Sequence, residues 1–96
     1  VMVDCSHGNS NKDYRRQGEV ATAVAEQLRA GSRHVMGVMI ESHLVAGNQK
    51  IPADLSQLTY GQSITDACID LSTTRELLAQ LAAAVADAQT KAAALV

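Results

Sequence analysis

Three side chains in this sequence are of the types that hold divalent metal ions in proteins. His7 follows a short apolar run, Glu41 ends a second apolar run, and Asp66 lies in the segment after it. One imidazole with two carboxylates suits a borderline or hard cation such as manganese, iron, cobalt or zinc. The residue types therefore indicate a possible metal site at His7, Glu41 and Asp66.

Each of the three also has an ordinary structural explanation, because their spacing is not a short fixed motif such as HExxH. His7 could cap a turn or form a hydrogen bond in the core, and Asp66 could begin a helical turn. Glu41 follows an apolar run and risks burial, which is costly for a charge unless it is paired or bound to a metal. From spacing alone, both explanations stay open.

The segments that carry these residues predict a β-α-β unit. Residues 1–7 are typical of a buried strand that ends in a turn, and residues 34–41 are apolar on both faces, as in a covered parallel strand. Between them, Ser10 and Asp13 predict the start of a helix that ends near residue 31. Its apolar face is expected to comprise Val20, Ala21, Val24, Ala25 and Leu28.

The second half of the chain predicts a long connection and a final helix. Residues 43–69 are too many for an idle connection, and an ordered loop of this length is more often functional. Thr73 and Glu76 predict the N-terminal cap of the last helix, before an alanine-rich tail. The expected buried stripe of that helix is Leu78, Leu81 and Val85.

The expected fold class is α/β, in a single domain over residues 1–96 with no internal boundary. Two βα units cannot close a barrel, and their apolar strands would expose unpaired edges. The natural completion is a (β/α)8 TIM barrel, with an open doubly wound sheet as the alternative. We therefore expect an incomplete piece of a longer protein, which in isolation self-associates or folds poorly.

His7 and Glu41 are both expected at the carboxyl ends of their strands. In parallel α/β folds this end carries the active site, and neighbouring strands lie ~4.8 Å apart, so the two side chains could reach one ion. Because side chains alternate along a strand, Cys5 and His7 are expected on the same face. Cys5 would then lie one layer deeper and pack as a small apolar residue.

Composition argues against several functional classes. The net charge of −2, with scattered basic residues, lacks the electrostatic footprint of a nucleic-acid-binding protein. No apolar run approaches the ~18 residues of a membrane span. Cys5 and Cys68 form no CxxC pair, so no disulfide framework is indicated and a reducing, cytoplasmic location is expected.

Four short segments are distributed along most of the chain. They are Asp4–Ser10 (DCSHGNS), Gly37–Leu44 (GVMIESHL), Gly47–Gln49 (GNQ) and Tyr60–Cys68 (YGQSITDAC). In this order and spacing they resemble the signature stretches of the type I, feedback-regulated class of 3-deoxy-D-arabino-heptulosonate-7-phosphate (DAHP) synthases. Such an ordered match is far more specific than any single motif.

The resemblance implies a (β/α)8 barrel to which this chain would supply the seventh and eighth βα units. It assigns His7, Glu41 and Asp66 as three of four metal ligands, and the fourth, a cysteine on the first barrel strand, is not in this sequence. It implies phosphoenolpyruvate and erythrose 4-phosphate as substrates, with His7 as a catalytic residue beside phosphoenolpyruvate and Asp66 as a further substrate contact. The phosphate-binding residues would come from earlier strands, so the chain alone is expected to be inactive. A homo-oligomer is expected.

Two other functions remain as alternatives. The first is a 3-deoxy-octulosonate-phosphate synthase, a related enzyme that uses similar substrates. The stretch Gly61–Asp66 argues against this alternative. The chain could instead be a non-catalytic module that self-associates through its strand edges. Residues interpreted as packing or local hydrogen-bonding groups, and kept off the ligand set, are Tyr14, His43, Tyr60 and Cys68.

Overall fold

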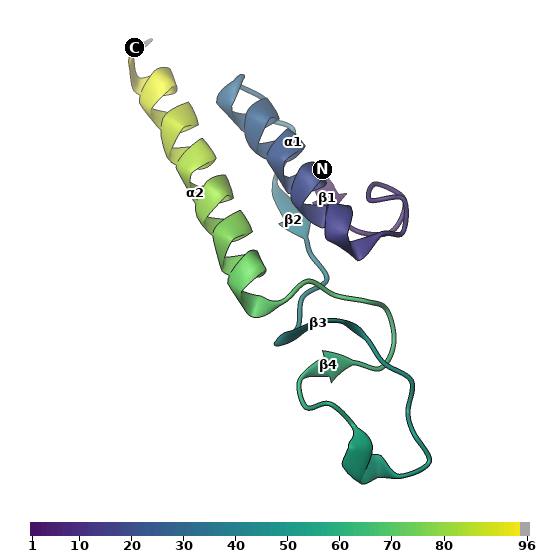
Figure 1. Ribbon diagram of the computed structural model, residues 1–96. Coiled ribbons are helices and arrows are strands. Elements are labelled where there is room, and N and C mark those ends of the chain that lie inside the picture. The colour runs from purple at the N-terminus through teal and green to yellow at the C-terminus, as the bar shows by residue number, and fades with distance from the viewer. Residues whose placement is uncertain (95–96) are drawn as a thin grey trace.

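The computed structural model describes residues 1–94 and shows an elongated α/β arrangement (Figure 1). The elements in chain order are strand β1 (Met2–Asp4), the 3-10 turn η1 (Tyr14–Arg16), helix α1 (Gln17–Arg29), strand β2 (Gly37–Met39), strand β3 (Val45–Asn48), the 3-10 turn η2 (Leu55–Gln57), strand β4 (Gln62–Ser63) and helix α2 (Leu71–Ala94). The two long helices run side by side along one end of the molecule, and β3 and β4 lie at the other (Figure 1).

The expected β-α-β unit is present. Strands β1 and β2 pair in parallel, with Met2 opposite Gly37 and Asp4 opposite Met39, and helix α1 connects them. Both strands are shorter than the predicted ranges 1–7 and 34–41. The ladder ends when the chain bends after Asp4, so the predicted strand alternation does not extend from Cys5 to His7.

Helix α1 buries the face that its sequence predicts. Ala21, Val24 and Ala25 are almost completely inaccessible, while Val20 packs against the core from a half-buried position. The predicted cap at Ser10 is wrong, because a 3-10 turn precedes the helix and Asp13 caps that turn by accepting a hydrogen bond from the Arg15 N–H. The residues between β1 and η1, which were predicted to begin the helix, form a polar turn instead.

Helix α2 begins three residues earlier than predicted and turns a different face to the core. Asp70 Oδ1 accepts a hydrogen bond from the Thr73 N–H at 2.8 Å, so Asp70 fills the capping role predicted for Thr73. Leu77 and Ala84 are buried, whereas the predicted Leu78 and Val85 are 53% and 44% exposed. The third residue of the predicted stripe, Leu81, is half-buried, so the prediction holds in part at Leu81 and is wrong at Leu78 and Val85.

The core joins both helices to the two parallel strands. Its buried cluster comprises Cys5, Ala21, Ile69 and Leu77, with Tyr14, Val20, Val38 and Ile40 packed against it. These residues come from both halves of the chain, so packing of α2 also anchors the long connection that precedes it. Tyr14 packs as expected, but Tyr60 is 89% exposed and does not.

The connection over residues 43–69 contains a small parallel pairing that the sequence did not predict. Val45 lies opposite Gln62 and Asn48 opposite Ser63, with an irregularity between them. Polar side chains complete the structure: the Gln49 amide bonds the backbone of Thr59 and Gln62, and the Gln62 amide donates to the Ala46 carbonyl. Side-chain-to-backbone bonds therefore replace a regular ladder here.

The shape of the described chain leaves much apolar surface uncovered. Its radius of gyration is 16.4 Å, whereas a compact domain of this length is expected near ~12.5 Å. Val1, Met2 and Met36, at the start of the paired strands, are 75%, 61% and 80% exposed. Within residues 1–94, no helix is long and apolar enough to span a bilayer.

Candidate metal centre

His7, Glu41 and Asp66 meet at one point beside the carboxyl ends of β1 and β2. Each offers one ligand atom, and the three atoms all lie within 4.8 Å of one another. His7 Nε2 is 3.6 Å from Glu41 Oε1 and 3.5 Å from Asp66 Oδ2. The structure thus brings together the three residues that the sequence singled out, from positions 34 and 59 residues apart along the chain.

His7 is held by the turn that follows β1. Its backbone adopts φ 48°, a left-handed conformation that costs a non-glycine residue about 1–2 kcal/mol. This bend carries the ring back toward Asp4, whose Oδ2 lies 2.8 Å from Nδ1. Because a carboxylate can only accept, Nδ1 carries the proton and donates it to Asp4. Nε2 is then the unprotonated nitrogen in neutral His7, and it faces the two carboxylates.

The other oxygen of Asp4 is also used. Asp4 Oδ1 accepts a hydrogen bond from the Ser6 N–H at 2.8 Å, and the Asp4 carbonyl accepts one from the Asn9 amide at 2.7 Å. Asp4 therefore closes the turn and orients the His7 ring at the same time. A carboxylate behind a metal-binding histidine is a common arrangement, since it fixes the tautomer and the ring direction.

Glu41 is positioned by two side chains from other elements. Ser6 Oγ donates a hydrogen bond to Glu41 Oε1, and the Gln17 amide bonds both the N–H and the carbonyl of Glu41. The Glu41 side chain is 20% exposed, the least of the three. The sequence predicted that the Glu41 carboxylate could be buried, and in the structure it is half-buried and accepts a hydrogen bond.

Asp66 reaches the centre from the long connection. Its side chain is 69% exposed. The segment that carries it is tied to the strands, because the Ile69 N–H donates to the Glu41 carbonyl at 3.0 Å and the Asn48 amide donates to the Thr65 carbonyl at 2.9 Å. Asp66 is thus placed by loop contacts on both sides rather than by a strand.

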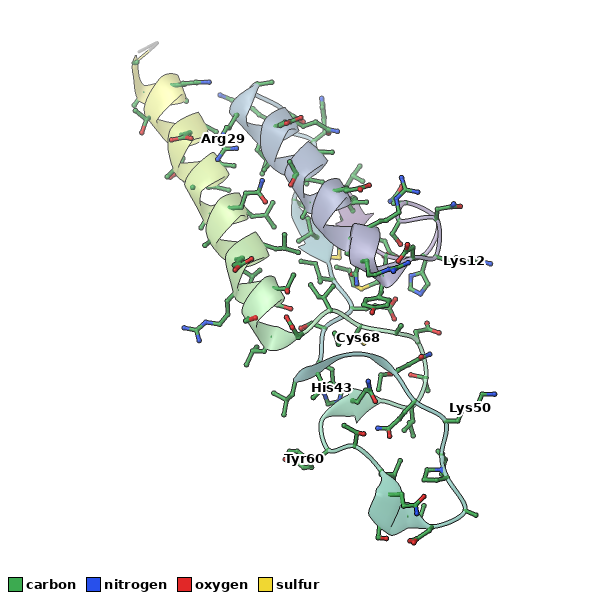
Figure 2. All side chains as sticks on the ribbon, viewed as in Figure 1. Lys12, Arg29, His43, Lys50, Tyr60 and Cys68 are labelled. Atoms are coloured by element: carbon green, nitrogen blue, oxygen red, sulfur yellow. The ribbon has the colours of Figure 1, made fainter. Side chains whose placement is uncertain are left out.

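The three residues line an open pocket of about 410 Å³. Its lining comprises Ser6, His7, Lys12, Tyr14, Glu41, Asn48, Asp66 and Ala67. Sequence reasoning missed Ser6, Lys12 and Asn48, because polar residues in turns, and Asn48 at the end of the unpredicted strand β3, carry no periodic signal. Lys12 lies in the turn after β1, next to the centre, and also has a left-handed backbone, φ 59° (Figure 2).

Electrostatics follow from these contacts. The hydrogen bond that His7 Nδ1 donates to Asp4 raises the pKa of His7, and the negative charges of Asp4 and Glu41 raise it further. The same hydrogen bond lowers the pKa of Asp4. The centre therefore carries excess negative potential that attracts a cation, and a proton on His7 is its simplest competitor.

Two groups kept off the ligand set behave as expected. Cys5 and Cys68 are buried free thiols, and burial raises the pKa of both, which disfavours the thiolate that a metal would need. His43 Nδ1 accepts a hydrogen bond from the Leu44 N–H at 2.8 Å, so it serves its own loop (Figure 2).

The separations of His7 Nε2 from the two carboxylates are compatible with a shared metal ion. Separations of 3.5 and 3.6 Å between His7 Nε2 and the carboxylate oxygens exceed the usual range of hydrogen bonds, about 2.7–3.2 Å. Ligand atoms bound tetrahedrally at about 2.0–2.2 Å lie roughly 3.3–3.6 Å from each other. The donor set and its spacing therefore suit a small divalent cation.

Comparison with known proteins supports the family resemblance seen in the sequence. The model of the DAHP synthetase I family matches residues 1–79, which include the three candidate ligands and everything that positions them. The chain belongs to the DAHP synthetase I family. The match covers β1, α1, β2 and the whole connection, and it ends within α2.

Relatives of the family are similar over most of this chain. A phospho-2-dehydro-3-deoxyheptonate aldolase of Alternaria alternata is 57% identical over 91 residues, which are 94% of this chain and 24% of the relative. The Tyr-sensitive enzyme of that name from Escherichia coli is 52% identical over 81 residues, 84% of this chain and 23% of the relative. The names denote the heptonate enzyme and not the octulosonate enzyme, which disfavours the first alternative.

A solved structure shows the same fold. The phospho-2-dehydro-3-deoxyheptonate aldolase of Francisella tularensis superposes with a TM-score of 0.85 at 51% identity, over 92% of this chain and 25% of that one. The α/β arrangement is thus that of a family member. The chain spans about a quarter of the length of the relatives that it matches.

Proposed function

We propose that this chain forms the metal-holding part of a DAHP synthase, which joins phosphoenolpyruvate to erythrose 4-phosphate and water to give DAHP and phosphate. The observation that carries the proposal is the cluster of His7, Glu41 and Asp66, whose ligand atoms lie within 4.8 Å of one another at the carboxyl ends of two parallel strands. The names of the relatives support the choice of reaction.

The chain would be the seventh and eighth βα units of a (β/α)8 barrel. Two parallel strands, each followed by a helix, are what two such units require. Two units of eight are a quarter of a barrel, and the chain covers 24% and 25% of its relatives. The exposed apolar start of β1 and β2 would then pack against the neighbouring units, with the remaining metal ligand and the phosphate-binding residues supplied by earlier strands.

The reaction forms a bond between C3 of phosphoenolpyruvate and the aldehyde carbon of the sugar phosphate. Water adds at C2 of phosphoenolpyruvate, and phosphate leaves with cleavage of its C–O bond. His7, Glu41 and Asp66 would hold a divalent ion, which would supply Lewis-acid polarisation of the aldehyde oxygen. Manganese, iron, cobalt and zinc all suit these ligands.

The residues of this chain would bind, orient and hold charge. Asp4 keeps the proton on His7 Nδ1, so that Nε2 is available as a ligand beside phosphoenolpyruvate. Glu41 and Asp66 contribute the negative charge that retains a cation, and the exposed Asp66 carboxylate can also accept a hydrogen bond from a sugar hydroxyl. The open pocket leaves room for the reacting atoms next to His7.

The test uses the full-length protein that carries this chain. We expect release of phosphate from phosphoenolpyruvate that depends on erythrose 4-phosphate, and loss of that activity with a chelator. His7→Ala should remove bound metal and turnover together, while the matched control His34→Ala, an exposed histidine outside the pocket, should keep both. Activity with arabinose 5-phosphate in place of erythrose 4-phosphate would favour the octulosonate enzyme. Full activity and metal content in His7→Ala would refute the proposed site.

A further inference from the structure

Gln17 is the largest side chain that is completely buried in the described chain. It is the first residue of α1, and Ala21, one turn later on the same helix, belongs to the buried core. A primary amide buried among apolar groups is unfavourable unless its donors and acceptor are bonded. The contacts of this amide therefore show what the residue does.

Both ends of the Gln17 amide bond the backbone of a single residue, Glu41, which lies 24 positions later. Gln17 Nε2 donates to the Glu41 carbonyl at 3.0 Å, and Gln17 Oε1 accepts from the Glu41 N–H at 2.8 Å. This pair of bonds is the one that a neighbouring strand would supply. Here it comes from a helix.

The bonds act where the strand ladder has stopped. The pairing of β1 with β2 ends at Asp4 and Met39, and one further bond runs from the Cys5 N–H to the Met39 carbonyl at 2.9 Å. Glu41 lies two residues beyond that point. The Ile69 N–H gives its carbonyl a second bond at 3.0 Å, but in the described part of the chain the Glu41 N–H has its acceptor in Gln17.

We propose that Gln17 is a positioning residue, which fixes the peptide of Glu41 and thereby the direction in which the Glu41 carboxylate meets the metal ion. This inference rests on the metal site proposed above. Gln17 would not touch the ion, because its amide oxygen and nitrogen are both engaged by the backbone of Glu41.

The carboxylate of Glu41 is sensitive to such placement. Its Oε1 accepts the hydrogen bond of Ser6 Oγ and also lies 3.6 Å from His7 Nε2. A rotation of the Glu41 peptide would move this oxygen away from both. An apolar side chain of similar size at position 17 would fill the same space, but the bond from the Ile69 N–H would then be the remaining described bond that opposes this rotation.

The experiment is a metal titration of the full-length protein, with Gln17→Met as the main variant. Methionine keeps the length and nearly the volume of glutamine but loses both hydrogen bonds. We expect manganese to bind about 10–100-fold more weakly, as for other residues behind metal ligands. The visible spectrum of the cobalt form should change as well. The matched control Gln27→Met, an exposed position on the same helix, should match the unsubstituted protein in both measurements.

A merely structural role gives a different result. It would lower the melting temperature but leave metal affinity and the cobalt spectrum unchanged when both are measured well below that temperature. Gln17→Leu also removes both hydrogen bonds with a neutral side chain, and it should weaken metal binding as Gln17→Met does. It serves as the test variant if Gln17→Met does not fold.

The failure of this inference is separable from failure of the site. Unchanged affinity and spectrum in both Gln17 variants, with metal lost in Glu41→Ala, would overturn the role of Gln17 alone. Unchanged metal binding in Glu41→Ala would contradict the metal site, and the role of Gln17 with it.

Discussion

Two regions hold the proposed metal centre by different physical means. The β-α-β body, residues 1–41 with α2, places His7 and Glu41 through a strand ladder and a core shared by both helices. The connecting loop, residues 43–69, places Asp66 with two short strands and polar side chains. Its apolar residues Ile51 and Tyr60 are exposed, as Figure 2 shows for Tyr60. The body relies mainly on burial, and the loop relies on hydrogen bonds except at its end, where Cys68 and Ile69 are buried.

Two glutamines make the difference concrete. Gln17 in the body and Gln49 in the loop each bond both the N–H and the carbonyl of one distant residue, Glu41 and Thr59 respectively. Gln17 is fully buried and Gln49 is half-buried. Because a lost hydrogen bond costs more where water cannot replace it, the same pair of bonds should count for more in the body.

The largest expected effect concerns the ligands themselves. In the full-length protein, Glu41→Ala should weaken metal binding by more than the ~100-fold typical of residues behind a ligand, because a direct ligand is lost. Asp66→Ala should weaken it less, since Asp66 is 69% exposed and lies on the loop. Metal titration measures both. Equal losses would contradict the division between a fixed body and a loop.

The second effect concerns the packing of the body. Leu77 is 8% exposed and belongs to the core cluster, so Leu77→Ala should lower the free energy of unfolding by about 2–4 kcal/mol. Its neighbour Leu78 is 53% exposed, and Leu78→Ala should change that free energy by no more than about 0.5 kcal/mol. Denaturant unfolding of the full-length protein measures both. A larger loss for Leu78 would show that the stripe predicted from sequence is the one that packs.

A smaller effect should mark the loop. Gln49→Met removes three hydrogen bonds at a half-buried position and should destabilise the loop locally by about 1–2 kcal/mol. Hydrogen exchange at the amides of Thr59 and Gln62 should quicken, while the amides of α1 keep their protection. Gln57→Met, at an exposed position, is the control. Faster exchange throughout α1 would mean that body and loop unfold together.

The smallest effect concerns pH. The raised pKa of His7 means that its proton stabilises the folded, metal-free protein below about pH 6.5, the ordinary histidine value, and that this contribution is lost as pH rises through the raised pKa. Metal competes with that proton, so affinity should increase over the same interval. Asp4→Asn removes the main cause of the shift, and the midpoint should move to lower pH.

Metal titrations across about pH 5.5–8.5 would measure this midpoint. Asp13→Asn provides the control, because Asp13 is also a hydrogen-bonded carboxylate with a lowered pKa but pairs with Arg15. An unchanged midpoint in Asp4→Asn would show that Asp4 does not govern the ring of His7.

Much of the body could be predicted because its signals are local. The order of strand, helix and strand and the buried face of α1 were predicted from apolar spacing, whereas the ligand set was predicted only through the resemblance to the family. The buried face of α2 was predicted one residue out of phase at Leu78 and Val85, because an alanine-rich helix carries little contrast between faces. The strands β3 and β4 were not predicted at all, because glycine and polar residues in residues 45–63 hide the alternation.

The sequence by itself determined which residues could bind a metal and that two of them follow parallel strands. It did not determine that Asp4 turns back on His7, or that Gln17 bonds the backbone of Glu41 across 24 positions. The physical reason is the separation along the chain of the residues that interact. Periodicity is set by neighbours along the chain, whereas hydrogen bonds between distant polar groups exist only after the apolar core has packed the helices against the strands.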